Sequence, residues 1–280
     1  MATWGDKTWL ITGASSGFGR AMADLVLRRG GRVIGTARDA TTLAGLVESG
    51  GGRAIGVALD VSDRQQTATA MEQVAAFGGA DVLFNNAGYG FLGGLEESAL
   101  DEIDAQFDVH VFAPIRLAKA VLPGMRERGR GFILNMSSIA GVKGFPGSPF
   151  YTGSKAALAG VSESLAGEVA PFGIGVMVIE PGFFRTDFAG RSIRKTAFPH
   201  PAYEALAKGR ARVEKGDGVQ PGDPARGVAA ILAAMEAETP PMHLALGPDA
   251  YDFVAGVLEA RRAELEAWAE TTKGTDFVTE

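Results

Sequence analysis

Tyr151 and Lys155 are the residues of this chain that could most directly perform acid–base chemistry, and they stand four places apart. On a helix this spacing puts both side chains on one face. A phenol has a pKa of about 10 in water, and a neighbouring ammonium lowers it by favouring the phenolate. A shift of about three units corresponds to roughly 4 kcal/mol. The same spacing also fits a half-buried tyrosine beside a solvated lysine, so the pair needs support from elsewhere in the chain.

A glycine-rich segment near the beginning of the chain supplies that support. The apolar run of residues 7–11 has the character of a strand, and it leads into Thr-Gly-Ala-Ser-Ser-Gly-Phe-Gly at residues 12–19 and a helical run from Ala21. Such an arrangement forms a phosphate site, because the glycines admit a pyrophosphate and the free N–H groups of the helix receive its charge. The spacing is G-x-x-x-G-x-G rather than the commoner G-x-G-x-x-G. The alternative is a tight turn that serves only close helix packing.

Three further motifs follow in order: Asn-Asn-Ala-Gly at residues 85–88, Asn-Met-Ser-Ser at residues 135–138, and Pro181-Gly182 followed by Thr186. The second places Ser138 thirteen residues before Tyr151. Together with the glycine turn and the Tyr/Lys pair, these motifs resemble those of the short-chain dehydrogenases/reductases, over residues from about 7 to about 247. The resemblance implies an oxidoreductase that uses a nicotinamide dinucleotide.

Apolar strand-like runs alternate with helical patterns, which predicts an α/β fold: a single Rossmann-like, doubly wound, seven-stranded parallel sheet with helices on both faces. Strands are expected near residues 8–12, 32–37, 53–58, 81–84, 131–136, 174–179 and 242–246. Helices are expected near 17–29, 40–49, 63–77, 97–124, 150–171 and 224–237. We expect one domain over residues 1–280. It carries a substrate-loop insertion near 183–223, over the carboxyl edge of the sheet, and a C-terminal helical extension near 249–272, docked on the domain or on a neighbouring subunit.

The resemblance assigns catalytic roles to Ser138, Tyr151, Lys155 and the position of His110. Tyr151 would be the general acid in reduction and the base in oxidation. Lys155 would lower its pKa and hold the nicotinamide ribose, and Ser138 would hydrogen-bond the reacting oxygen. His110 stands where family members commonly have Asn, whose backbone carbonyl helps to hold a water in a proton relay to the lysine. A carbonyl remains at His110; its imidazole could join the relay or be a satisfied core histidine.

We expect NADP(H) rather than NAD. An acid at the end of the second strand binds the ribose 2′-OH of NAD and repels the 2′-phosphate of NADP. The family's acidic position falls on Ala37, and Arg38 follows with a planar fork of donors that suits a 2′-phosphate. Asp39 comes one place later, and a shift of the alignment by one residue would reverse this conclusion. Asp60 corresponds to an adenine-contacting Asp of the family, or else it caps the helix that starts near Asp63.

The resemblance carries the family's cofactor contacts over to sixteen positions. These are Gly13, Ser15, Ser16, Gly17, Gly19, Arg38, Asp60, Val61, Asn86, Ala87, Gly88, Tyr151, Lys155, Pro181, Gly182 and Thr186.

The expected function is the interconversion of a ketone or aldehyde and an alcohol on a small, largely apolar substrate, by hydride transfer with Tyr151 as acid/base. Loops after the fourth, fifth and sixth strands carry apolar side chains typical of such a pocket, although core packing would explain several of them. They are Tyr89, Phe91, Leu92, Ile139, Val142, Phe145, Phe150, Phe183, Phe184 and Phe188. Residues 185–215 contain eight Lys or Arg against three Asp or Glu, which would attract an anionic substrate or form a solvated lid. The alternative functions are a non-redox epimerase or dehydratase and a nucleotide sensor.

Composition excludes several other classes. There is no cysteine, and the three histidines at 110, 200 and 243 are far apart in the sequence, so no metal site is expected. A net charge of −6 argues against nucleic-acid binding. No apolar stretch is long enough for a membrane span, and the first strand begins within ten residues of Met1, which leaves no room for a signal peptide. We therefore expect a cytoplasmic protein with a small-molecule substrate and no nucleic-acid or membrane partner.

The sequence also predicts that the protein associates with copies of itself. Residues 156–167 are rich in small side chains. In the family, this helix and the one near 97–124 form a four-helix contact with a two-fold partner, so a homodimer or homotetramer is expected. Alternatively, the small residues let the helix lie close to its own sheet.

Overall fold

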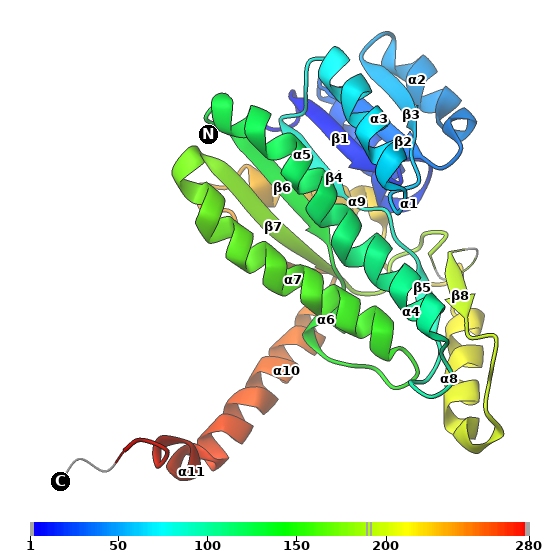
Figure 1. The fold of residues 1–280 in the computed structure, drawn as a ribbon, viewed down its shortest axis with the longest axis vertical. Helices are drawn as coiled ribbons and strands as arrows, with labels where there is room; N and C mark the ends of the chain where they lie inside the picture. The colour runs from blue at the N-terminus through cyan, green and yellow to red at the C-terminus, as the bar shows by residue number, and fades with distance from the viewer. Residues whose placement is uncertain (1–2, 189, 191, 278–280) are drawn as a thin grey trace.

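Seven parallel strands form the central sheet of the protein, in the order β3-β2-β1-β4-β6-β7-β9 (Figure 1). The structure is a computed structural model that describes residues 3–188, 190 and 192–277. The strands are β1 Thr8–Thr12, β2 Arg32–Ala37, β3 Ala54–Ala58, β4 Val82–Asn85, β6 Gly131–Met136, β7 Ile174–Pro181 and β9 His243–Leu246. All seven were expected from the sequence, with bounds that differ by at most two residues. The doubly wound α/β fold is confirmed.

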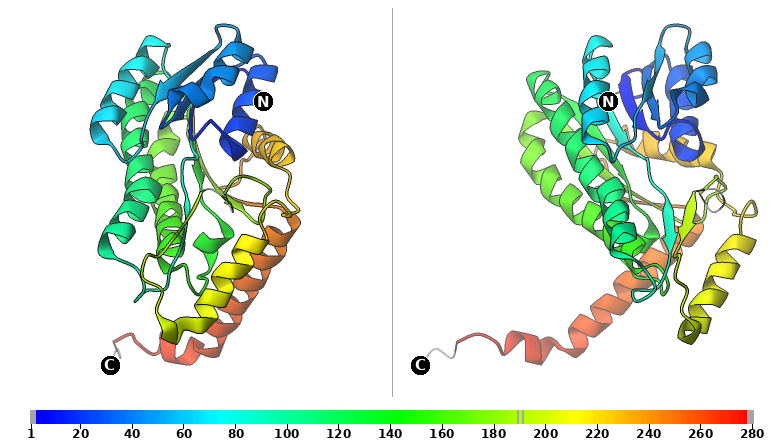
Figure 2. Two further views of the ribbon diagram at one scale, coloured as in Figure 1. Left: turned by 90° about the vertical axis from the view of Figure 1, so that its right-hand side faces the viewer. Right: turned by 45° about the vertical axis from the view of Figure 1, so that its right-hand side comes forward.

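Helices cover both faces of the sheet and enclose two cores. On one face lie α1 Gly17–Arg28, α2 Ala44–Gly50 and α9 Pro224–Met235, and on the other α3 Arg64–Ala76, α5 Ala113–Glu127 and α7 Pro149–Val169 (Figures 1 and 2). Side chains alternate along β1, so Trp9 and Ile11 enter the first core and Leu10 enters the second. β1, β4 and β6 are buried along their whole length, which explains their continuous apolar sequences. The short helices are η1 Ala40–Leu43, α6 Ile139–Val142 and η3 Ala170–Phe172.

The single helix expected near 97–124 is in fact three segments: α4 Leu100–Phe107, a π-helical segment η2 Asp108–Phe112, and α5. In η2 the Ala113 N–H bonds to the carbonyl of Asp108, five residues back. Pro114 explains part of this widening, because it has no N–H to continue the α-helical ladder. The irregular segment carries His110 and faces α7.

One strand of the insertion pairs with a strand that follows β4, and together they form a second, small sheet that the sequence did not reveal. β5 Gly90–Leu92 pairs in parallel with β8 Ile193–Lys195, and η4 Pro201–Tyr203 and α8 Glu204–Lys215 follow. These strands are three residues long and lie about a hundred residues apart in the chain, so no local pattern announces their pairing. β5 comes directly after β4, which places this small sheet beyond the carboxyl edge of the large one (Figure 1).

The C-terminal helix α10 Pro248–Ala267 and the short α11 Ala269–Lys273 project away from the body of the molecule (Figure 2). The beginning of α10 contacts β9 and α6, and Val257 is buried there. Residues 258–268 are exposed on all sides, including Leu258, Leu265 and Trp268. The expected docking on the same domain therefore holds for the helix as far as Arg261, which donates to the carbonyl of Val142, and not for its last turns.

The described residues contain neither a helix that could span a membrane nor a cluster of metal ligands. None of their helices combines the length and apolarity that crossing a membrane requires. Within the same residues, no three His, Asp or Glu side chains come together to hold a metal ion.

Candidate active site

The glycine turn between β1 and α1 has the backbone conformation that its sequence predicts. Gly13 and Gly17 adopt φ angles of 66° and 54°, which favour glycine. A Cβ atom at Gly19 would lie 2.3 Å from the carbonyl oxygen of Gly13, so only glycine fits there. Ser16, the N-cap of α1, makes no side-chain capping hydrogen bond. The first N–H groups of α1 are thus left without a side-chain cap, as an anion site at a helix N-terminus requires.

The Asn-Asn-Ala-Gly motif braces this turn from the neighbouring strand. The Asn86 side chain donates to the carbonyl oxygens of Thr12 and Gly13, at 2.9 and 3.3 Å. The Thr12 hydroxyl oxygen accepts from the backbone N–H groups of Asn86 and Ala87, both at 3.0 Å. Asn86 and Ala87 were predicted to contact the cofactor, but the polar contacts that the structure gives them hold the turn in shape.

A buried chain of amides and hydroxyls joins the second and third motifs. Asn85 donates to Asn135 at 2.8 Å, and Asn135 donates to Ser162 of α7 at 2.7 Å. All three side chains are buried. Buried polar groups must find partners, so this chain fixes β4, β6 and α7 relative to one another beneath the site.

The loop after β7 approaches the glycine turn from the other side. Thr186 lies opposite Gly17, where an added Cβ atom would be 3.4 Å from the threonine Cβ. Pro181 and Gly182 begin this loop at the end of β7. Residues 13–17 and 181–186 therefore face each other, as a site shared by the two ends of a dinucleotide requires.

Asp39, one place after Arg38, caps the short helix that follows β2. Its carboxylate accepts hydrogen bonds from the backbone N–H and the hydroxyl of Thr41, at 2.9 and 2.7 Å, and so caps η1. These bonds, that from the hydroxyl first, lower the pKa of Asp39. Arg38 is exposed, and Ala37 ends the strand.

Asp60 does not cap α3, which was one of its two expected roles. The cap is Asp63, whose carboxylate accepts from the N–H groups of Gln65 and Gln66 at 2.8 and 3.0 Å. Asp60 instead accepts from the backbone N–H and hydroxyl of Ser62, at 3.0 and 2.6 Å, and orders the loop after β3 that contains Val61.

Ser138, Tyr151 and Lys155 come together where β6 ends and α7 begins. Ser138 is the N-cap of α6, and its hydroxyl oxygen accepts from the N–H of Ala140 at 3.1 Å. Tyr151 lies in the first turn of α7, close enough to Ser138 for the serine hydroxyl to act against the rise of the tyrosine pKa. The Lys155 Nζ atom lies 5.8 Å from the centre of the Tyr151 ring. The predicted grouping of these three side chains is present in the structure.

Burial dominates the ionisation of this group in the protein alone. It raises the pKa of Tyr151 to about 12, while the hydrogen bond with Ser138 acts in the opposite direction. It lowers the pKa of Lys155 to about 7. The lowering of the tyrosine pKa expected from Lys155 is therefore not a property of the protein without its cofactor, because desolvation penalises both charged forms.

The imidazole of His110 is buried, and both of its ring nitrogens have hydrogen-bond partners. Its Nε2 atom accepts from the N–H of Tyr89 at 3.2 Å, so the proton is on Nδ1, which donates to the Ser154 hydroxyl at 3.0 Å. Ser154 in turn donates to the carbonyl of Tyr151 at 2.8 Å. Burial, and then the charge of Lys155, hold the pKa of His110 well below its usual range. The side chain thus connects the loop after β4 to the first turn of α7 as a neutral group.

The backbone carbonyl of His110 remains suited to the role implied by the family resemblance. Its α-helical donor would be residue 114, which is a proline without an N–H. Sequence reasoning missed Ser154 and also Gln106, whose buried amide lies 2.9 Å from the imidazole. The four-residue spacing of Gln106 and His110 could have predicted this contact, because side chains four places apart are neighbours on a helix.

The apolar side chains expected around the substrate divide into two groups. Phe188 lies over the site, with its ring centre 5.9 Å from that of Tyr151. Phe91 and Ile139 are buried, and Phe184 packs on Phe18 within the core at 4.9 Å. Core packing therefore accounts for several of the phenylalanines, as the alternative interpretation held.

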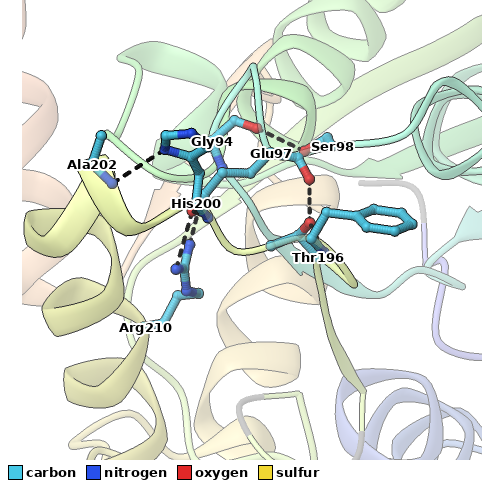
Figure 3. A network of polar contacts seen from close by, with 8 residues as sticks. Gly94, Glu97, Ser98, Thr196, His200, Ala202 and Arg210 are labelled. Carbon is cyan, nitrogen blue, oxygen red and sulfur yellow. Dashed lines mark hydrogen bonds and ion pairs between the residues drawn. The ribbon is translucent and has the colours of Figure 1, made fainter.

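A buried ion pair fastens α8 to the loop after β5 (Figure 3). The Glu97 carboxylate accepts from Arg210 at 2.7 and 3.3 Å and from the backbone N–H groups of Gly94 and His200 at 2.8 and 3.0 Å. These contacts, that with Arg210 first, lower the pKa of Glu97 to about 2. Arg210 is one of the basic residues of the insertion. Because its charge is paired with Glu97, it favours a lid over a surface that attracts an anionic substrate.

Comparison with known proteins agrees with this geometry. The family model described as short chain dehydrogenase matches residues 7–197. The 3-ketodihydrosphingosine reductase of Bacteroides thetaiotaomicron is 37% identical over 85% of this chain and 87% of its own length.

Solved structures share the fold. A short-chain dehydrogenase from Streptomyces avermitilis is 44% identical, with a TM-score of 0.90 over 98% of this chain and 100% of its own. A metagenomic short-chain oxidoreductase solved with NADP is 36% identical, with a TM-score of 0.60 over 65% of this chain and 84% of its own. One from Burkholderia phymatum solved with NAD is 26% identical, with a TM-score of 0.75 over 100% of this chain and 99% of its own. From its motifs, its fold and these likenesses, the chain belongs to the short-chain dehydrogenase/reductase family and is an oxidoreductase.

Proposed function

We propose that the protein is an NADP(H)-dependent enzyme that interconverts a ketone or aldehyde and an alcohol on a small, largely apolar substrate. The observation that carries this proposal is the meeting of Ser138, Tyr151 and Lys155 at the start of α7, beneath Phe188. The glycine turn and Thr186 frame the adjoining dinucleotide site.

The dinucleotide, when bound in its reduced form, supplies a hydride to the carbonyl carbon. Ser138 then hydrogen-bonds the carbonyl oxygen on which negative charge develops. Tyr151 donates its proton to the same oxygen, and a pKa raised to about 12 means that the phenol is protonated at neutral pH before it acts. Lys155 lies close enough to stabilise the phenolate that is left and to hold the nicotinamide ribose.

Two features support NADP(H) over NAD. The Oδ1 atom of Asp39 accepts both hydrogen bonds from Thr41, which supports a capping role for Asp39 rather than the role of the missing acid at Ala37. Arg38, which follows Ala37 and is exposed, would then offer its guanidinium to a 2′-phosphate. The solved relative with NADP is consistent with this choice, although NAD occurs in the family as well.

An apolar carbonyl compound suits the residues around Tyr151. Phe188 covers the tyrosine, and Leu206 of α8 approaches Gly94 and Gly147 at the edge of the loops. A relative named for the reduction of 3-ketodihydrosphingosine supports a keto group as the acceptor. Absorbance assays of NADPH consumption with a panel of apolar ketones and aldehydes test the proposal.

The non-redox and sensor alternatives predict a different result in the same assay. Either would bind NADPH without consuming it, whatever carbonyl compound is supplied. The complete Ser138, Tyr151 and Lys155 set favours turnover, because a sensor has no need for a buried acid beside the nucleotide.

We also propose that the protein is a single-domain homodimer or homotetramer that associates through α7 and the α4–α5 segment. Ala156, Gly160 and Gly167 lie on the exposed face of α7, and a Cβ atom added at either glycine would meet no atom within 4 Å. Phe112 is 53% exposed. Small residues on an open face permit the close helix approach that a two-fold contact requires.

A further inference from the structure

The second residue of α10, Asp249, holds the loop after β7. Its Oδ2 atom accepts a 2.7 Å hydrogen bond from the backbone N–H of Phe183. The carboxylate fits between two glycines: an added Cβ atom would lie 2.2 Å from it at Gly182 and 2.6 Å from it at Gly247. The two glycines therefore leave a space that this one side chain fills.

This bond continues the attachment of β7 to β9 beyond the end of the sheet. Pro181 is paired with Leu246, and the Gly182 N–H donates to the Leu246 carbonyl at 3.0 Å. The next N–H, that of Phe183, has no strand carbonyl to meet, and Asp249 supplies the acceptor. Successive N–H groups of the loop are thus fixed, three residues before Thr186 reaches Gly17.

The same helix also contacts the loop after β6. Phe253 stacks on Phe145 at 5.3 Å between ring centres, and Arg261 donates to the carbonyl of Val142. That loop begins at Ser138. Helix α10 therefore touches the loops on both sides of the site, through residues 249–261.

We propose that Asp249 is a positioning residue for the dinucleotide site: through Phe183 it fixes residues 181–186 in the conformation that meets the nicotinamide end of the cofactor. This role rests on the proposed function, because it assumes that a dinucleotide lies against this loop. Hydrogen bonds to charged acceptors are stronger than neutral ones, and removing one that orders a binding loop changes affinity by about tenfold or more.

Three variants separate positioning from a general effect of charge at the helix N-terminus. Asp249→Asn keeps an acceptor oxygen in place and removes the charge. Asp249→Glu keeps the charge, but its extra methylene does not fit between Gly182 and Gly247. Asp249→Ala removes both. Asp252→Ala is the matched control, since Asp252 is an exposed acid of α10 to which the structure gives no partner among the described residues.

Two readouts are independent of turnover: amide hydrogen exchange of residues 182–184 in the cofactor-free protein, and the Kd for NADPH from fluorescence titration. We expect the Ala and Glu variants to exchange faster and to bind NADPH about tenfold more weakly. Asp249→Asn, which keeps a weaker neutral hydrogen bond, should fall between these variants and the unmutated protein, and Asp252→Ala should stay within about twofold of the unmutated protein. Steady-state kinetics should show a raised KM for NADPH with a smaller change in kcat.

The outcomes distinguish this inference from the proposed function. If the unmutated protein binds NADPH and folded Asp249→Glu binds it equally well, Asp249 acts only through its charge and the inference is wrong. Unchanged exchange at Phe183 in Asp249→Ala contradicts it as well. If the unmutated protein binds neither NADPH nor NADH, the proposed function itself fails.

Discussion

Lys155 donates a 2.7 Å hydrogen bond to the carbonyl oxygen of Met136, two residues before Ser138. The ammonium is buried, and this bond fixes it where β6 ends. Burial lowers the pKa of Lys155 to about 7, so the charge of its side chain changes near neutral pH. Burial of this lysine thus destabilises the folded state whenever its amine is protonated.

That cost predicts a pH dependence of stability in the cofactor-free protein. Between about pH 7, the pKa of Lys155 in the folded protein, and about pH 10.5, the ordinary pKa of a lysine, the unfolded chain binds more protons than the folded one. The free energy of unfolding should therefore rise with pH in this window, by up to about 1.4 kcal/mol per pH unit. Above about pH 10 the raised pKa of Tyr151 acts in the opposite direction.

Urea denaturation at pH 7, 8 and 9 measures this slope. Lys155→Met should flatten it, whereas Lys119→Met, which removes an exposed lysine of α5, should leave it unchanged. Equal slopes in the unmutated protein and Lys155→Met would show that Lys155 keeps its charge in the folded state.

Tyr151→Phe should lower kcat at least about a hundredfold, because general acid–base catalysis contributes on this scale. The Kd for NADPH should change little, since the phenylalanine keeps the ring that packs on Phe188. Tyr251→Phe, at an exposed position of α10, is the matched control. Turnover that survives in Tyr151→Phe would remove Tyr151 from the proton transfer.

Ala37→Asp should shift the preference from NADP towards NAD by at least about tenfold in kcat/KM, through repulsion of the 2′-phosphate. Asp39→Asn tests the alternative alignment. Asparagine can still cap η1, so the preference should not move. A protein that already uses NAD as well as NADP, or an effect confined to the Asp39 variant, contradicts the assignment of Arg38.

Arg210→Ala should loosen α8, because it leaves the buried carboxylate of Glu97 without its cation; breaking such a pair costs about 3–5 kcal/mol. We expect faster amide exchange in residues 204–213 and a raised KM for the carbonyl substrate, with the Kd for NADPH unchanged. Arg212→Ala changes an exposed residue of the same helix and should do neither. Since the pKa of Glu97 is lowered to about 2, its contribution is present above pH 4.5 and is lost as the pH falls towards 2.

Gly160→Trp should lower the mass measured by light scattering at micromolar concentration from that of an oligomer to that of a monomer. The position is open within the chain, so the new side chain clashes only with a partner. Gly45→Trp, at an exposed position of α2 on the opposite face of the sheet, should leave the mass unchanged. A monomeric unmutated protein would refute the proposed association.

The sequence predicted what depends on local patterns and motif order. It located all seven strands of the sheet, and the order of the motifs predicted that Ser138, which follows β6, lies near Tyr151 and Lys155 in the first two turns of α7. The sequence did not predict features that depend on residues far apart in the chain. Asp60 and Asp63 are equally good caps by type, and only the start of α3 at Arg64 selects between them. The neutral state of Tyr151 depends on burial, which the four-residue spacing with Lys155 does not report.

The three tryptophans of the chain fall into two classes. Trp4 and Trp9 are 9% and 0% exposed and belong to the core beneath α1 and α9, whereas Trp268, at the end of α10, is 62% exposed. A collisional quencher such as acrylamide therefore has access to one indole of the three. Trp268 is therefore an intrinsic fluorescent probe at the far end of α10. Quenching of that indole reports whether the end of the helix lies in water or against another molecule, without an introduced dye.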